Sequence, residues 1–588
     1  MSGSGGMGES AARHHRHIFI GCALALLLMT IYLLRIDSDD IVVRYFREQD
    51  LPVLTGLFGS WLVIVLVPWT PNLPVRSLFD RDIAWVALLA VMGVLLWWGT
   101  YAVMFDYSLT RDEHMVLFDM AVFGKGHLAE PLAPEWRGFA KALVPAFLLQ
   151  PSHPIGVVSD YLPGNAWLRL TVSRITDPAL MNPMLAVMGG LALLNVAKRL
   201  FGEDRGAIAI AMLLYVSSAQ MLVNAMTVYA MTPHMALNLI WLAAFLRGGK
   251  AGHGIAMLVG SYAMGLHQII FHPLFAGPFL LWSFARREWR VVAFYACGYA
   301  VAAFAWTHYA GLASLSAAPP ELLSGGANAD FLRDRLMPLL LNRNPNMLLL
   351  MGYNVGRFLA WQNLALLPLA VAAWAAVRRN EGLAAPLMAG PVLALVVVGF
   401  LLPYQGHGWG YRYLHGFLGS FALLGGYGWQ VLRKFNGGKT PFSVIVLACL
   451  TLISSLPWLL IQAHWFVAPY VRLDHVIQGA ATDMVLVDTQ APSAAVDQVR
   501  NRPDLGNRPI RLSSRELTSS DVLTLCQRGT ISLLTRKDMH NVGFALGVPT
   551  NSPKFDALVA PLAHASCLRD KKGDGWTRTL WLPQSAGL

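Results

Sequence analysis

Charged residues are scarce in this chain. Of its 588 residues only 13% are Asp, Glu, Lys or Arg, whereas 55% are hydrophobic. A water-soluble chain of average composition carries about 25% charged residues, so this balance excludes an ordinary soluble enzyme. The apolar residues gather in runs of about 17–22, long enough to cross a hydrocarbon core about 30 Å thick. The sequence therefore predicts a polytopic membrane protein that is mainly α-helical.

Cysteine and the common phosphate-binding motifs are also nearly absent. The chain has five cysteines, no CxxC or Cys/His metal spacing, no P-loop and no GxGxxG after a strand. These absences exclude zinc modules, P-loop NTPases and dinucleotide-binding domains of the usual kind. Cys22, Cys297 and Cys449 lie in apolar runs and are expected to be small buried residues. Cys526 and Cys567 share the last segment of the chain, where a disulfide and two free thiols are equally compatible with the sequence.

Thirteen apolar segments are candidate membrane spans. The first follows RHHRH and is too long for the apolar region of a signal peptide, and no cleavage site follows it. Several others are short or contain proline, so the number is accurate to one or two. The segments are 18–34, 54–69, 83–104, 183–197, 207–223, 234–246, 254–270, 273–284, 291–310, 362–377, 384–402, 413–432 and 441–465.

The connections between these segments are alternately rich and poor in Lys and Arg, as the positive-inside rule requires. If the N-terminus is cytoplasmic, every inside connection contains at least two Lys or Arg, whereas the external connections 224–233 and 271–273 contain none. The inside connections are 76–82, 198–205, 247–250, 285–290, 378–381 and 433–439. The loop 105–182 and the segment 466–588 are therefore predicted outside the cytoplasm. The net charge of +11 reflects this topology, and we expect no nucleic-acid partner.

The two external segments have the composition of folded structure. In the loop, 112–128 and 164–175 have the apolar spacing of helices that lie along a membrane surface. In the last segment, MVLVDT at 484–489 and TISLLT at 530–535 are predicted strands, and 519–529 and 556–567 predicted helices. We expect a small α/β domain there.

Acidic and cationic side chains share the external side. Asp112 and Glu113 begin the first surface helix, where acids complement the helix dipole by less than about 1 kcal/mol without any catalytic role. The same side also holds Arg412, whose position at the outer end of a span is costly unless the guanidinium has a partner such as phosphate. Further polar residues on this side are His153, Asp160, Tyr229, Thr232, His234, His267, His272, Tyr411 and Tyr413. Acids and cations beside lipid suit a reaction between a lipid-borne phosphate ester and an acceptor hydroxyl.

Three stretches resemble the integral-membrane C-type glycosyltransferases, in the bacterial branch related to protein O-mannosyltransferases and lipid A aminoarabinose transferases. They are TRDEHMVLFDMAVFGKGHLAEP at 110–131, SDYLPGNAWLRL at 159–170 and GWGYRYLHGFLG at 408–419. The order and topology of about 105–432 agree with that branch. Two spans precede its usual first one, and Leu162 replaces the first proline of an expected pair.

The resemblance implies a polyprenyl-phosphate-linked sugar donor, an acceptor that is an envelope lipid, glycan or protein, and inversion at the anomeric carbon. It implies a hexosyl- or pentosyltransferase of the inner membrane, with the N-terminus cytoplasmic. The resulting divisions are a tail 1–17, two additional spans 18–82, a membrane core 83–465 and a periplasmic domain 466–588. No cofactor is expected, and a bound divalent metal is left open because no ligand cluster points to one.

The resemblance also implies roles for single residues. Asp112 is the expected general base, with Glu113 assisting it. Arg412, helped by Tyr411 or Tyr413, is expected to bind the donor phosphate. His267 and His272 are either further phosphate contacts or structural histidines of a helical hairpin. The last group, expected to shape the acceptor or sugar pocket, is His153, Asp160 and Tyr161.

Two other functional classes remain as alternatives. A transporter or flippase of lipid-linked sugars requires polarity through the bilayer midplane, whereas these span interiors are nearly free of charge. A scaffold protein would use the external domain to bind a partner and would leave the polar residues on the membrane face unexplained.

Overall fold

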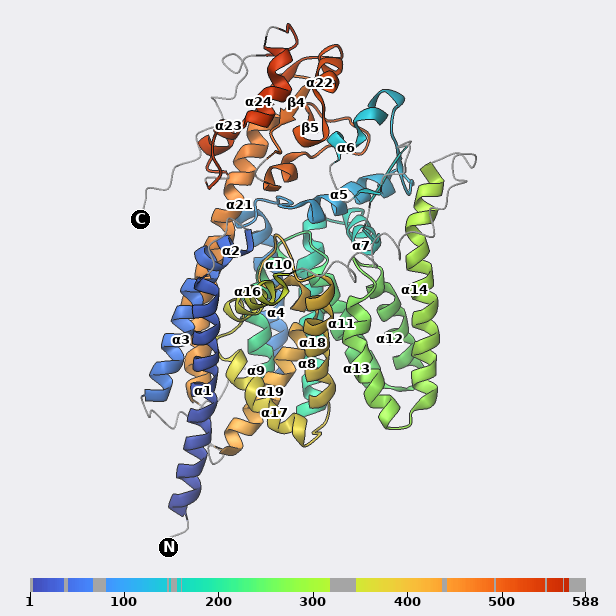
Figure 1. Ribbon diagram of the computed structural model, residues 1–588. Coiled ribbons are helices and arrows are strands. Elements are labelled where there is room, and N and C mark those ends of the chain that lie inside the picture. Colours follow the sequence, from blue (N-terminus) through green and yellow to red (C-terminus); the bar gives the residue numbers. More distant parts are fainter. Residues whose placement is uncertain are drawn as a thin grey trace. The chain divides into compact units, whose positions relative to one another are not determined.

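The chain forms two compact units in the computed structural model. Unit 1 comprises residues 1–103, 175–307 and 329–463, and unit 2 comprises 104–174, 308–328 and 464–588. Figure 1 shows the helices and strands coloured along the sequence. The structure describes residues 4–35, 41–66, 81–144, 148–149, 156–159, 161–317, 345–435, 442–490, 493–544, 547–563 and 565–569.

The described part of unit 1 is a helical bundle. Its N-terminal helices are α1 (Ser4–Leu34), α2 (Ile41–Tyr45), the π-helix η1 (Phe46–Asp50), α3 (Leu51–Leu66) and α4 (Asp82–Ala102). The central helices are η4 (Pro178–Leu180), α8 (Met181–Phe201), α9 (Arg205–Val216), α10 (Ala219–Ala225), α11 (Met231–Arg247), α12 (Gly249–Met264) and α13 (Phe271–Ala285). The later helices are α16 (Met347–Ala360), α17 (Leu366–Arg378), α18 (Ala384–Leu401), η7 (Arg412–Phe417), α19 (Leu418–Phe435), α20 (Phe442–Leu450) and η8 (Thr451–Ser455). The long helices α14 (Trp289–Ala317) and α21 (Leu456–Gln478) contribute residues to both units.

Every predicted span contains helix among its described residues, but the number of spans stays a prediction. Among the described residues, seven helices are long and apolar enough to cross a membrane, and the bent pair α9 and α10 makes an eighth if it is one span. Other predicted spans are shorter; α13, with 15 residues, is only about 22 Å long. The structure is therefore that of a multi-pass membrane protein with seven or eight helices of spanning length in its described part.

Close packing between these helices depends on small residues. Helix α17 packs on α19, and α19 packs on α9. A Cβ atom added at Gly428 of α19 would lie 2.0 Å from the backbone oxygen of Leu369 in α17. One added at Gly425 would lie 2.1 Å from the Leu214 side chain. Glycine lets the helix backbones approach to a distance that any side chain would prevent.

The second span begins earlier than predicted and contains buried charge. The sequence places it at 54–69, whereas the helical run is Ile41–Leu66 and includes Asp50. Asp50 is buried because it has partners: the indole of Trp361 donates to it at 2.7 Å, and Arg357 lies 3.9 Å away. Asp50 precedes the predicted span 54–69 and Arg357 lies in the shorter helix α16, so 307 residues separate the pair in the chain.

Unit 2 begins with the segment predicted as two surface helices. These are α5 (Arg111–Gly124) and α7 (Gly164–Ser173), which pack on each other. The elements between them are β1 (Glu130–Pro131), η3 (Pro134–Phe139), α6 (Ala140–Leu143), β2 (Leu148–Leu149) and β3 (Gly156–Ser159). The three strands form an antiparallel sheet of order β1-β3-β2. Its strands of two to four residues are too short to give a periodic pattern, so the sequence did not predict them.

The last segment is the expected small α/β domain. Strands β4 (Met484–Val487), β5 (Ile510–Ser513) and β6 (Ile531–Leu534) form a parallel sheet of order β5-β4-β6, with Met484 opposite Ile510 and Ile531. Strands β4 and β6 were predicted. Strand β5 was not, because Arg511 interrupts its apolar pattern; the guanidinium is buried against Asp474.

Short helices and a disulfide complete this domain. The helices are η9 (Ser493–Gln498), η10 (Ser514–Glu516), α22 (Ser519–Cys526), α23 (Arg536–Asn541), α24 (Pro553–Val559) and η11 (Ala560–Leu562). Helix α22 lies within the predicted helix 519–529, and α24 with η11 overlaps the predicted helix 556–567. Cys526 and Cys567 form a disulfide, which decides between the two alternatives that the sequence left open.

Candidate functional site

The two predicted catalytic acids have different surroundings at the start of α5. Glu113 is 1% exposed, and its carboxylate accepts from the backbone N–H of Thr110 at 3.3 Å. The Thr110 hydroxyl in turn accepts from the backbone N–H of Glu113, which completes a capping box. Asp112 is half-buried and has no part in this cap. The carboxylate of Glu113 is therefore part of the helix cap, whereas the carboxylate of Asp112 bonds to residues outside the cap.

Tyr161 is one of those partners. Its hydroxyl donates to Oδ1 of Asp112 at 2.6 Å, although the residues are 49 apart in the sequence. The backbone N–H of Tyr161 donates to the hydroxyl of Ser159 at the end of β3, which holds the tyrosine in place. A short hydrogen bond to a carboxylate fixes its orientation and favours its ionised form. His153 and Asp160, predicted for the same pocket, lie outside the described residues.

A second buried acid lies on the same side of α5. Asp119 follows Asp112 by two helical turns, about 10 Å along the axis. Burial raises its pKa well above the usual range, opposed by a hydrogen bond with the Ser159 side chain. The burial of Asp119 under α7 and the short sheet could not be read from a helical pattern in which it occupies a polar position.

In unit 1, Arg412 is held by a turn between α18 and η7. The side chain of Gln405 donates to the backbone oxygen of Gly410 at 3.1 Å and accepts from the backbone N–H of Arg412 at 3.1 Å. Gln220 of α10 donates to the backbone oxygen of Tyr411 at 2.8 Å. Gly410 has φ +66°, and a Cβ there would lie 2.5 Å from the Gln220 side chain. Only glycine fits this position of the turn.

Arg412 lines a small cavity with histidines. We call it the cation cavity, and its lining residues are Met231, His234, Asn238, His267, Phe271, Arg412, Tyr413, Gly416 and Phe417. Three of the predicted phosphate-binding residues, Arg412, Tyr413 and His267, therefore meet here. The Arg412 guanidinium lies 5.3 Å from the ring centre of Tyr413. The cavity presents a guanidinium, imidazoles and an amide, all donors suited to an anion.

Two other predicted phosphate contacts lie elsewhere. His272 has both ring nitrogens in hydrogen bonds at 2.8 Å, one with Asn238 and one with the Tyr299 hydroxyl. This favours the alternative of a structural histidine. Tyr411 is buried, and its hydroxyl contacts the sulfur of Met351. Neither side chain lines the cation cavity.

His234 is the residue that sequence reasoning missed as a candidate ligand. It is 6% exposed, and neither of its ring nitrogens has a hydrogen-bond partner among the described residues. A buried polar group without a partner is costly and indicates a ligand or water. The only sequence signal was its place at a span boundary with Tyr229 and Thr232.

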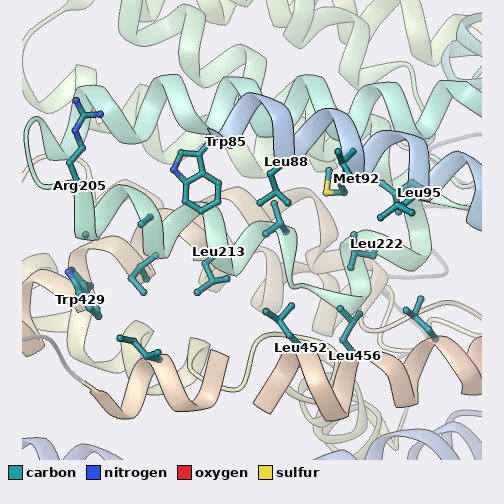
Figure 2. A pocket seen from close by; sticks show the side chains of 18 of the residues that line it. Trp85, Leu88, Met92, Leu95, Arg205, Leu213, Leu222, Trp429, Leu452 and Leu456 are labelled. Carbon is teal, nitrogen blue, oxygen red and sulfur yellow. The ribbon is translucent and has the colours of Figure 1, made fainter. Parts of the chain in front are cut away.

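Unit 1 also contains a large apolar cavity of about 1010 Å³. Its walls are formed by α4, α9, α10, α19, α20, η8 and α21. Figure 2 shows Arg205 and Trp429 toward one end, with Leu222 and Leu456 toward the other. Because both Trp85 and Val103 of the α4 segment line it, the cavity extends about 27 Å along that helix. Its length and lining suit the hydrocarbon chain of a lipid.

The sequence left undecided whether the protein binds a divalent metal ion. In the part of the chain that the structure describes, no group of three or more His, Cys, Asp or Glu side chains is placed to hold an ion. Metal dependence therefore stays an open expectation.

Two solved structures are similar to this chain. Both are of ArnT from Cupriavidus metallidurans, one in the apo state and one bound to undecaprenyl phosphate. The apo structure is 12% identical over 71% of this chain and 84% of ArnT, with a TM-score of 0.44. The second is 13% identical over 72% of this chain and 86% of ArnT, with a TM-score of 0.45. No protein-family model and no curated protein matches the chain. At these values the similarity assigns neither activity nor residue roles.

Proposed function

We propose that this protein transfers a sugar from a polyprenyl-phosphate donor to an acceptor hydroxyl at the outer face of the cytoplasmic membrane, with inversion at the anomeric carbon. The observation that carries the proposal is the cation cavity. Arg412 and His267, predicted from the sequence as phosphate contacts, line it together with the buried His234, whose ring nitrogens have no hydrogen-bond partner among the described residues. The guanidinium and the imidazoles are donors that suit a phosphate oxygen.

The chemistry of the proposed reaction follows from these residues. The acceptor oxygen attacks the anomeric carbon and the carboxylate of Asp112 takes the hydroxyl proton. The bond from the anomeric carbon to the phosphate oxygen breaks, and polyprenyl phosphate leaves with the electron pair. Arg412 and the imidazole N–H groups stabilise the charge that develops on that phosphate. The hydrogen bond from Tyr161 keeps the carboxylate oriented before the proton arrives.

The test separates the base from the phosphate site. Asp112→Asn is expected to reduce acceptor-dependent release of polyprenyl phosphate by about 10²–10⁴-fold while donor binding is retained. Arg412→Met and His234→Ala are expected to weaken donor binding by about 10- to 100-fold each, since each loses a hydrogen bond to a charged group. Matched controls are Asp556→Asn and Arg379→Met, both at exposed positions. Full activity of Asp112→Asn would remove that residue from the mechanism, and unchanged donor binding in both cavity variants would refute the phosphate site.

The large apolar cavity favours a second candidate, a transporter or flippase of lipid-linked sugars. A cavity about 27 Å long is close to the thickness of a hydrocarbon core. The same labelled donor distinguishes the two functions in vesicles. Movement of donor between leaflets without acceptor would support transport, whereas release of polyprenyl phosphate only with acceptor would support transfer.

A further inference from the structure

The backbone just before Asp112 is held by the C-terminal α/β domain. Arg500 donates from Nη1 to the hydroxyl of Ser108 and from Nη2 to the backbone oxygen of Leu109, each at 3.0 Å. Its guanidinium lies 4.2 Å from the ring centre of Tyr107. One side chain thus binds three consecutive residues of a segment that is nearly 400 positions away in the sequence.

Asp497, near the end of η9, binds Arg111, two residues further along this segment. Its Oδ1 accepts from the backbone N–H of Arg111 at 3.3 Å and from Nε of Arg111 at 3.2 Å. Arg111 is the first residue of α5, so its backbone N–H is one of those that the helix leaves unpaired. The carboxylate is 7% exposed. An acid of the C-terminal domain therefore binds the first turn of the helix whose second residue is Asp112.

Asp497 and Arg500 are themselves joined. Nε of Arg500 donates to the backbone oxygen of Asp497 at 2.6 Å. The following Asn501 donates to the backbone oxygens of Leu143 and Arg511, both at 2.8 Å, which ties this segment to α6 and to strand β5. The contacts with 107–111 therefore come from a segment that is anchored in the sheet of the domain.

We propose that the C-terminal α/β domain positions the catalytic carboxylate, with Asp497 and Arg500 as the positioning residues. The proposal rests on the proposed function, because it gives the domain a role in the reaction of Asp112. It accounts for the presence of a buried carboxylate at Asp497. Burial raises the pKa of Asp497 to about 6 although Arg111 and Arg500 oppose the rise, so desolvation outweighs both guanidinium groups.

Asp112 also lies close enough to Asp497 for its charge to raise the pKa of Asp497. Other groups around this pair are Arg111, Arg500, Tyr161 and His114. Burial beside Arg500 and Arg511 lowers the pKa of His114 to about 3, so this histidine is neutral over the working pH range.

The test uses the full-length protein with a labelled donor and an acceptor. Asp497→Asn and Arg500→Met are expected to lower kcat by about 10- to 100-fold, the loss typical of a small displacement of a reacting group, with KM for the donor unchanged. Arg508→Met is the control, since Arg508 is an exposed arginine of the same domain that donates to the backbone oxygens of Leu505 and Asn507 in its own loop.

Hydrogen–deuterium exchange over residues 107–116 gives a readout independent of catalysis. Faster exchange in Asp497→Asn and Arg500→Met, with unchanged exchange in β4–β6, is the expected result. Wild-type kcat and exchange in both variants would overturn the positioning role even if Asp112→Asn is inactive. If Asp112→Asn is fully active, the proposed function fails, while the exchange data still decide whether the domain holds this segment. A loss of activity with equally fast exchange throughout the domain would indicate unfolding and would also refute the proposal.

Discussion

Replacement of Asp497 by Asn is expected to change how the stability of unit 2 depends on pH. The side chain keeps its shape but no longer ionises, so the variant reports what the charge of this buried carboxylate costs. Burial raises the pKa of Asp497 from 3.8 to about 6. Because the pKa is higher in the folded protein, the neutral form is the one that folding favours. Protonation of Asp497 therefore adds to the free energy of unfolding. The added free energy is fully present below about pH 4 and is lost as the pH rises through about 6.

The size of the effect follows from the shift. A rise of about two pKa units corresponds to about 3 kcal/mol between the two protonation states. The wild type should therefore lose about 3 kcal/mol relative to Asp497→Asn between pH 4 and pH 7.5. The titrations of all other groups are common to both proteins and cancel in this difference. For a domain of this size, the difference in Tm should change by about 6–12 °C over the same range.

The assay is the temperature at which the C-terminal domain of the full-length protein becomes susceptible to protease. It is measured for both proteins at several pH values, with the cut sites identified by mass spectrometry. Asp504→Asn serves as a control of opposite sign, because hydrogen bonds and Lys125 lower the pKa of Asp504. Parallel pH curves for wild type and Asp497→Asn would show that Asp497 is not a buried ionisable group and would refute this reasoning.

Two further predictions concern stability elsewhere. Gly428→Ala forces a Cβ atom against the backbone of Leu369 and should lower the free energy of unfolding by at least about 1–3 kcal/mol. The loss should be seen as a lower Tm in detergent. Gly277→Ala is the control, because a Cβ atom there has open space around it. Equal Tm values for the two variants would contradict the close packing of α17 on α19. Cys526→Ser removes a disulfide whose partners are 41 residues apart and should destabilise the C-terminal domain by about 2–4 kcal/mol. The measurement is protease susceptibility, with dithiothreitol-treated wild type as the reference. A variant as resistant as the untreated wild type would show that the bridge contributes nothing.

Local patterns in the sequence determined much of this protein. Apolar runs alone marked thirteen segments, and each of them contains helix in the structure. The strands β4 and β6 are continuous apolar stretches bounded by polar residues, and they were found. Asp112, Tyr161, Arg412, Tyr413 and His267 were all named from short motifs. Such features depend on neighbours within a few residues, whose relative positions the backbone geometry of a helix or strand already sets.

Only the tertiary structure decided which of these side chains meet. His234 joins Arg412 in the cation cavity although 178 positions separate them, and Asp497 binds Arg111 across 386 positions. No periodic pattern encodes such a contact, because it depends on how whole helices and domains pack on one another. Burial then sets the chemistry: removal from water raises the pKa of Asp497 and leaves the His234 nitrogens without hydrogen-bond partners in the described part of the chain. The residue types were visible in the sequence, and their environments arose only on folding.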